Sequence, residues 1–157
     1  MTKNHHYIRF KRLGKNEPLP YGLLLLADPS KEMIDSYVKD SDVFVTLHNE
    51  DIVGVVVLLS LTTDEVEIKN IAVKPDFQGE GIGSYLIENV INIAKHKMKK
   101  NIFIGTSNSS VGQLSLYQKF GFEIVEIKKD YFIENYTDAI YEYGIQAKHL
   151  LVLKMDL

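Results

Sequence analysis

Apolar residues alternate with polar ones in some short runs of this chain and recur every three or four positions in others, which predicts a mixture of strands and helices. The predicted strands comprise residues 6–12, 43–48, 52–61, 65–73, 101–105, 122–127 and 149–155. The sequence NED at 49–51 is a hairpin signal between the second and third of these strands. The strand at 65–73 stops before Pro75.

Helical spacing predicts three helical regions, at 21–38, 81–99 and 111–120. Pro29 breaks the first region, and Ser30 is placed to cap its second piece. The core candidates of the first region are Leu23, Leu24, Leu26, Met33, Ile34 and Tyr37. Those of the second, which recur at helical spacing, are Ile82, Leu86, Val90, Ile93 and Ala94. Gly121 is predicted to end the third helix in a left-handed conformation.

The order of the predicted elements is β, α, α, β, β, β, α, β, α, β, β. Strands two to four follow one another as a meander, and the later strands alternate with helices, so we expect a mixed α/β sheet. The sequence contains no internal repeat, low-complexity tract or linker. A length of 157 residues suits one domain, and we predict a single domain over 1–157.

Composition excludes several classes of protein. A net charge of −3 argues against nucleic acid as the main partner, because phosphate backbones bind basic faces. The chain has no cysteine, which excludes disulfides, a thiolate nucleophile and cysteine-bound metal, and is consistent with a cytoplasmic location. The five histidines show no metal-binding spacing, so we expect no metal site. The polar, basic N-terminus and short apolar runs predict neither a signal peptide nor a membrane span.

Three glycines in five positions, Gly79, Gly81 and Gly83, lie between a predicted strand and a predicted helix. Their spacing fits neither the dinucleotide fingerprint G-x-G-x-x-G nor the P-loop, which needs Lys-Ser/Thr after the glycines. Backbone N–H groups at such a turn, together with the helix dipole, suit a pyrophosphate. The alternative is a tight turn without a ligand.

Two motifs favour a pyrophosphate site over a turn without a ligand. The stretch IAVKPDFQGEGIGSYL at 71–86 and the stretch LYQKFGF at 116–122 together resemble the two signatures of the GNAT superfamily of N-acetyltransferases. The order of the predicted elements also matches that of the family over nearly the whole chain. The resemblance implies a mixed, mostly antiparallel central sheet flanked by helices, with acetyl-CoA as co-substrate.

The resemblance also assigns residues to the cofactor. It implies that the splayed strand lies along the pantetheine arm and that the N–H of Val73 meets the thioester carbonyl. The implied cofactor-binding residues are Ile71, Ala72, Val73, Gln78, Gly79, Glu80, Gly81, Ile82, Gly83 and Ser84. Many members carry an asparagine seven residues before the motif tyrosine, where this chain has Ser110. Either Asn108 or Ser110 contacts the pantetheine, or neither does.

The same resemblance suggests Tyr117 as the general acid that protonates the leaving thiolate. The alternative is that Tyr117 is a core aromatic residue of an apolar helix face. Glu67 is the first candidate for the base that deprotonates the amine, and Glu65, on the same strand face, is the second. Surface carboxylates without a catalytic role are the alternative for both.

The segment at 130–147 holds four acidic residues, four tyrosines and no lysine or arginine. Acids with aromatic faces suit a cation, so we predict a cationic amine acceptor, either a small molecule or a peptide amine. A solvated loop or a dimer contact is the alternative, and a homodimer is plausible. The alternative to an enzyme is a non-catalytic acyl-CoA-binding module of the same fold, which would need no Tyr117.

Overall fold

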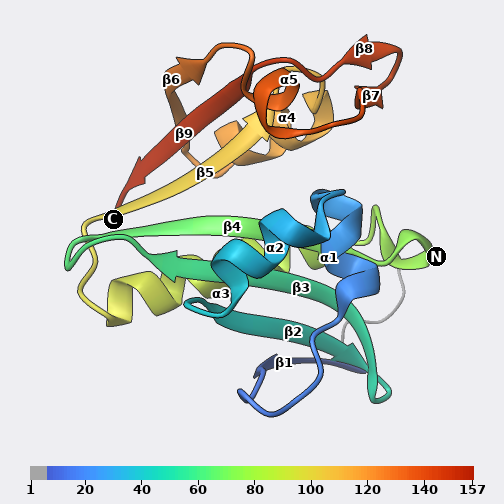
Figure 1. Ribbon diagram of the computed structural model, residues 1–157. Helices are drawn as coiled ribbons and strands as arrows, with labels where there is room; N and C mark the ends of the chain where they lie inside the picture. Colours follow the sequence, from blue (N-terminus) through green and yellow to red (C-terminus); the bar gives the residue numbers. More distant parts are fainter. Residues whose placement is uncertain (1–6) are drawn as a thin grey trace.

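The computed structural model describes residues 7–157, and within them a seven-stranded sheet has the order β1-β2-β3-β4-β5-β9-β6 (Figure 1). Its strands are β1 (Ile8–Arg12), β2 (Asp42–His48), β3 (Asp51–Ser60), β4 (Glu65–Val73), β5 (Asn101–Ser107), β6 (Glu123–Lys128) and β9 (Leu150–Asp156). Within the described residues, β4 and β5 are the only neighbouring strands of this sheet that run parallel, and all other neighbours are antiparallel. The predicted mixed, mostly antiparallel sheet is therefore confirmed. His6, the predicted start of the first strand, lies outside the described residues.

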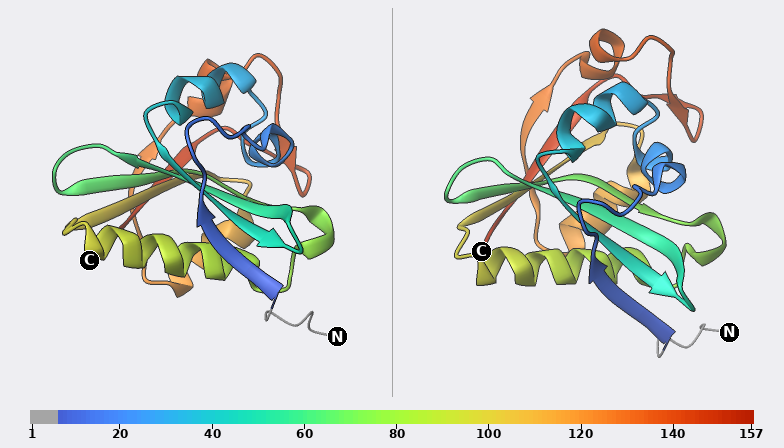
Figure 2. Two further views of the ribbon diagram at one scale, coloured as in Figure 1. Left: turned by 90° about the horizontal axis from the view of Figure 1, so that it is seen from below. Right: turned by 60° about the horizontal axis from the view of Figure 1, so that its bottom comes forward.

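Helices cover both faces of the sheet, as Figure 2 shows. They are α1 (Tyr21–Ala27), α2 (Lys31–Val38), the short 3-10 helix η2 (Pro75–Phe77), α3 (Ile82–His96), α4 (Val111–Lys119) and α5 (Tyr131–Asn135). The first two and α5 lie on one face, and α3 and α4 lie on the other. The break at Pro29 is confirmed, because Ser30 caps α2 by accepting the N–H of Met33 at 3.2 Å.

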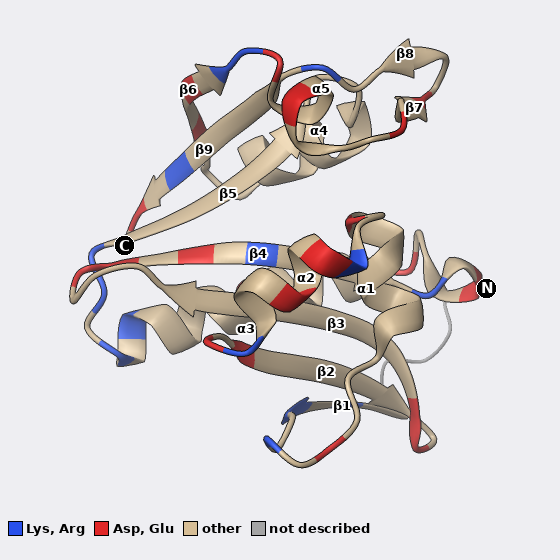
Figure 3. Cartoon of the chain, viewed as in Figure 1, with Lys and Arg blue, Asp and Glu red and all other residues tan. Residues whose placement is uncertain are grey.

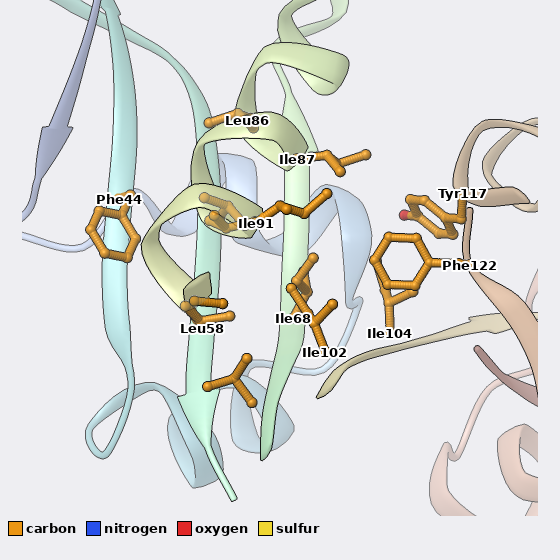
Figure 4. Packing of buried hydrophobic residues seen from close by; sticks show 14 of the residues in the cluster. Phe44, Leu58, Ile68, Leu86, Ile87, Ile91, Ile102, Ile104, Tyr117 and Phe122 are labelled. Atoms are coloured by element: carbon orange, nitrogen blue, oxygen red, sulfur yellow. The ribbon is translucent and has the colours of Figure 1, made fainter. Parts of the chain in front are cut away.

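Each face of the sheet has its own core. Helix α3 buries one side against the sheet through residues that include the predicted Ile82, Leu86, Val90 and Ala94 (Figure 4). On the other face, α1 and α2 pack on β2, β3 and β4. The prediction for Leu26 is wrong. Its side chain is 54% exposed, because the neighbouring Leu23 and Leu24 occupy the buried side of the short helix α1.

Strands β4 and β5 separate along their length. Their parallel pairing runs only from Glu65 opposite Asn101 to Ile68 opposite Ile104, and beyond this point the strands diverge (Figure 1). On its other edge, β4 stays paired with β3, and a register shift there leaves Lys69 as one extra residue. A bulge of this kind bends a strand and changes which side chains share a face. The gap that opens in the sheet is where the candidate site lies.

Two small elements after β6 were not predicted from the sequence. Helix α5 precedes a hairpin of two strands, β7 (Tyr141–Glu142) and β8 (Ile145–Gln146). The hairpin turn consists of Tyr143 and Gly144, which both have positive φ, at 54° and 74°. The strands are two residues long, too short for an alternating pattern to be visible in the sequence.

Candidate functional site

The glycine turn has the geometry of an anion-binding helix start. Gly79 and Gly81 have φ values of 76° and 87°, in the left-handed region that glycine adopts without a steric penalty. Gly81 caps α3 without any side-chain hydrogen bond, and the N–H of Tyr85 bonds back to the Gly81 carbonyl at 3.0 Å. The preceding N–H groups of α3, those of Ile82, Gly83 and Ser84, have no acceptor within the helix. This turn therefore fits a pyrophosphate, which needs several N–H donors and positive potential.

The rest of the turn is tied to the end of β4. The Gln78 side chain donates from Nε2 to the Val73 carbonyl at 2.9 Å, and the backbone N–H of Gln78 donates to the Pro75 carbonyl at 3.2 Å. Glu80 lies between the two left-handed glycines and is half-buried. The predicted cofactor residues of 78–84 thus form one rigid connection between β4 and α3.

Beyond Ile68, β4 presents a free edge toward the gap. The Lys74 N–H donates to the Val53 carbonyl of β3 at 2.8 Å. Because backbone groups alternate in direction along a strand, the N–H groups of Val73 and Ile71 point away from β3 and into the gap. Ala72, between them, directs its backbone toward β3. The predicted N–H of Val73 is therefore oriented toward the place where the strands separate.

Tyr117 lies on the α3 side of this gap. Its side chain is 4% exposed, and its ring lies 6.2 Å from that of Phe122 (Figure 4). Within residues 7–157, its hydroxyl forms no hydrogen bond that perturbs the group, and it is not one of the two fully buried unpaired oxygens, which are Thr46 Oγ1 and Asn70 Oδ1. Burial raises the pKa of the Tyr117 phenol well above its usual value, so the group is protonated at neutral pH. The residue is thus both a core aromatic, as the alternative stated, and a neutral donor without a partner.

Glu67 lies on the opposite face, in a cavity of about 240 Å³. Its side chain is 23% exposed, and its Oε2 lies 3.1 Å from Nζ of Lys69. Glu65 does not line this cavity, and its Oε1 accepts a hydrogen bond from the hydroxyl of Thr62 at 3.3 Å. Of the two proposed bases, the structure brings only Glu67 to the cavity.

This cavity reaches the gap between the strands. Ile68 of β4 and Gly105 of β5 line it together with residues of α2 and α5. Glu67 lines this cavity, whereas Tyr117 lies on the other face of the sheet, in the core cluster that includes Ile68 and Ile104 at the end of the β4–β5 pairing. A thioester in the gap with an amine in the cavity would give the two reactants a shared, confined position.

Asn108 and Ser110 have other partners in this structure. Asn108 Oδ1 accepts the N–H groups of Lys148 and His149 at 2.8 and 3.0 Å, and its Nδ2 donates to the Gln146 carbonyl at 3.1 Å. The Ser110 hydroxyl donates to Glu142 Oε1 at 2.8 Å. Both side chains hold the segment that begins at the β7–β8 hairpin. A contact of either with the pantetheine stays a prediction.

Apart from Glu67, the charged residues that line the cavity were not singled out in the sequence. None of the acids at 130–147 lines it, although Tyr131 and Tyr136 do. Its acidic residues besides Glu67 are Asp28, which precedes α2 in the chain, and Asp40, which follows it. Acidic residues also lie on α2 itself (Figure 3). In the sequence, Asp28 was visible only as part of the break between two helices. Nothing in a local pattern indicates that this break faces α5, about a hundred residues later.

Within residues 7–157, no group of three His, Asp or Glu side chains is arranged to hold a metal ion. In the same part of the chain, no helix has the length and apolar character required to cross a bilayer.

Comparison with known proteins agrees with this geometry. The model of the Acetyltransferase (GNAT) family matches residues 15–122. The uncharacterized N-acetyltransferase YvbK of Bacillus subtilis (strain 168) is 44% identical over 137 residues, which are 87% of this chain and 88% of that protein.

Two solved structures have nearly the same fold. A GNAT family acetyltransferase from Elizabethkingia anophelis with acetyl-CoA bound has a TM-score of 0.94 and 45% identity, over 97% of this chain and 99% of that one. The IAA acetyltransferase from Bacillus cereus ATCC 14579 has a TM-score of 0.92 and 41% identity, over 96% and 99%. The chain therefore belongs to the GNAT family and is an acetyl-CoA-dependent N-acetyltransferase.

Proposed function

We propose that this enzyme transfers the acetyl group of acetyl-CoA to a primary amine of a positively charged small molecule or peptide, by direct attack. The observation that carries the proposal is the gap between β4 and β5, which has the anion-binding turn at one end and a cavity with acidic and aromatic walls beside it. The acetyl-CoA in the Elizabethkingia anophelis relative supports the choice of donor.

In this reaction the amine nitrogen attacks the carbonyl carbon of the thioester. A C–N bond forms and the C–S bond breaks, while one proton leaves the nitrogen and one reaches the sulfur. The products are an acetamide and the free thiol of CoA. Negative charge develops on the carbonyl oxygen during attack, and the N–H of Val73, directed into the gap, is a suitable donor to that oxygen.

Tyr117 is the proposed general acid. A thiol has a pKa of about 8.5, so the departing thiolate is basic enough to accept a hydrogen bond and a proton from a nearby phenol. Burial keeps the phenol of Tyr117 neutral, and its hydroxyl has no competing partner among residues 7–157. A neutral phenol without a competing partner can donate to the sulfur as negative charge develops there, while burial makes it a weaker acid than a free phenol.

Glu67 is the proposed base. An alkylamine with a pKa of about 10 is protonated at neutral pH and must lose that proton before it attacks. A carboxylate in the cavity accepts the proton directly or through water. The ion pair with Lys69 means that an incoming ammonium competes with Lys69 for the Glu67 carboxylate.

The test compares Tyr117→Phe and Glu67→Gln with the wild type, by following release of free CoA in the presence of amines. For Tyr117→Phe we expect unchanged CoA affinity and a kcat lower by about a hundredfold, the usual contribution of acid–base catalysis. Tyr85→Phe, a change of the same kind on α3, is the control. For Glu67→Gln we expect the acidic limb of the pH–rate profile to disappear. Unchanged turnover in the first variant, or a retained acidic limb in the second, removes that residue from its role.

We also propose that the enzyme forms a homodimer through β6. This strand is an edge of the sheet, and all of its residues are exposed, including the apolar Ile124, Val125 and Ile127. Exposed apolar edge strands favour pairing with another strand. Antiparallel pairing of two copies of β6 sets Glu123 of each copy opposite Lys128 of the other, which is a favourable cross-strand pair.

A further inference from the structure

Asp28 is a buried carboxylate at the end of α1 and lines the cavity that contains Glu67. It is 9% exposed. Its Oδ1 accepts the hydroxyl of Tyr136 at 2.9 Å and the N–H of Ser30 at 3.2 Å, and its Oδ2 accepts the hydroxyl of Tyr37 at 3.3 Å. All of these donors are neutral.

Another acid of the cavity wall, Glu67, has the positively charged partner that Asp28 lacks. Lys69 pairs with Glu67 at 3.1 Å, whereas Asp28 forms no salt bridge within residues 7–157. A buried carboxylate without an opposite charge is costly, and neutral hydrogen bonds offset only part of that cost. A cation inside the cavity would supply the remainder.

The neighbours of Asp28 also suit a cation. Burial, with Asp28 as a further cause, raises the pKa of both Tyr37 and Tyr136 above the ordinary phenol value. One face of the Tyr136 ring stacks on Phe132, with 5.5 Å between the ring centroids, so a cation can reach it only from the other face. The two rings stay neutral, as a cation–π contact requires. The protein already uses one of them in this way, because Nζ of Lys69 lies 5.5 Å from the centroid of the Tyr37 ring.

The position of the Asp28 side chain is held from three sides. The Tyr37 hydroxyl accepts a hydrogen bond from Nδ2 of Asn70 at 3.1 Å, and the same Nδ2 donates to the Leu24 carbonyl at 3.0 Å. These contacts connect α2, β4 and α1, while Tyr136 brings in the chain after α5. The carboxylate is therefore fixed in place before any ligand arrives, which reduces the entropy lost on binding.

We propose that Asp28 binds a second, non-reacting cationic group of the acceptor, so that the preferred substrates carry at least two positive charges. The reacting amine lies at Glu67, beside the gap, and the second cation lies at Asp28 between Tyr37 and Tyr136. This inference rests on the proposed function for the identity of the reaction, but it concerns binding and is measurable without turnover.

The experiment uses a series of linear alkane diamines and the n-alkylamines of the same chain lengths. For the wild type we expect kcat/KM for the best diamine to exceed that of its monoamine by at least about tenfold, because a desolvated charge pair is lost with the monoamine. In Asp28→Asn this ratio is expected to fall below about threefold, with unchanged affinity for CoA. Asp138→Asn, which removes the same charge from a different cavity, is the control and should keep the ratio.

Calorimetric titration of the diamines and monoamines into the CoA-bound wild-type enzyme, where no acetyl group can be transferred, measures the same preference directly. This measurement needs no variant, so it decides the question even if Asp28→Asn does not fold. Equal binding of diamine and monoamine, or an unchanged ratio in Asp28→Asn, overturns the inference. Diamine-selective binding that depends on Asp28, with no acetylation of any amine, supports the inference and rejects the proposed function.

Discussion

Gly54 of β3 lies directly against the first turn of α3, and replacing it by alanine should disturb both stability and the cofactor turn. A Cβ at this position would lie 3.2 Å from Ile82 Cγ2 and 3.2 Å from Leu86 Cδ1, with Thr46 Cβ at 3.5 Å. Ile82 and Leu86 are 1% and 0% exposed, so neither side chain has free space into which to move. The added methyl group therefore has to displace α3 by a few tenths of an ångström.

Overpacking of this kind costs about 1–3 kcal/mol. Alanine also restricts the unfolded chain, which returns about 0.4–1 kcal/mol. The midpoints of these two ranges give a net loss of unfolding free energy in Gly54→Ala of about 1.3 kcal/mol, which for a domain of this size lowers Tm by about 3–5 °C. Thermal unfolding followed by circular dichroism measures this shift.

The same displacement should weaken CoA binding, because Ile82 begins the helix whose free N–H groups face the proposed pyrophosphate site. A loss of about 1 kcal/mol in these charge-assisted hydrogen bonds corresponds to a roughly fivefold weaker Kd for CoA, measured by calorimetry.

Gly22→Ala is the matched control for this substitution. A Cβ at Gly22 meets no atom within 4 Å, and the residue is helical, so stability should stay the same or rise by at most about 1 kcal/mol. If Gly54→Ala is as stable as the wild type and binds CoA equally well, the reasoning about close packing beneath α3 is wrong.

Two further predictions concern the C-terminal half of the chain. Asn108→Ala removes the acceptor of two backbone N–H groups at 148–149, so we expect a loss of about 1–3 kcal/mol in thermal unfolding with an unchanged KM for acetyl-CoA. Asn135→Ala is the control, and an unchanged Tm with a raised KM would instead indicate a cofactor ligand. Ile127→Lys on β6 should convert a dimer of 17.9 kDa chains to monomer in light scattering, whereas Ile133→Lys on the equally exposed α5 should not. A wild type that is monomeric at all concentrations refutes the dimer.

The sequence by itself determined the elements that are long enough to show a period. The alternating strand at 65–73 and the apolar stripe of α3 are present in the structure, and so is the left-handed Gly121 after α4. The glycine turn could also be predicted from the sequence, because positive φ and close backbone approach restrict the residue type directly. Two local motifs in the correct order were sufficient to identify the family and the donor.

Only the tertiary structure decided which side chains line the proposed acceptor cavity. The acids at 130–147 formed the conspicuous local cluster, yet the charged residues that line the cavity are Asp28, Asp40, Glu67 and Lys69. Asp28 meets Tyr136 across more than a hundred residues, and the bulge at Lys69 decides which β4 side chains face the cavity. Such contacts depend on how strands are ordered and how far two neighbours diverge. Local periodicity encodes the face of each element, but not the partner that it meets. The sequence therefore identified the acetyl donor, but of the proposed acceptor cavity it indicated only Glu67 and the tyrosines of 130–147.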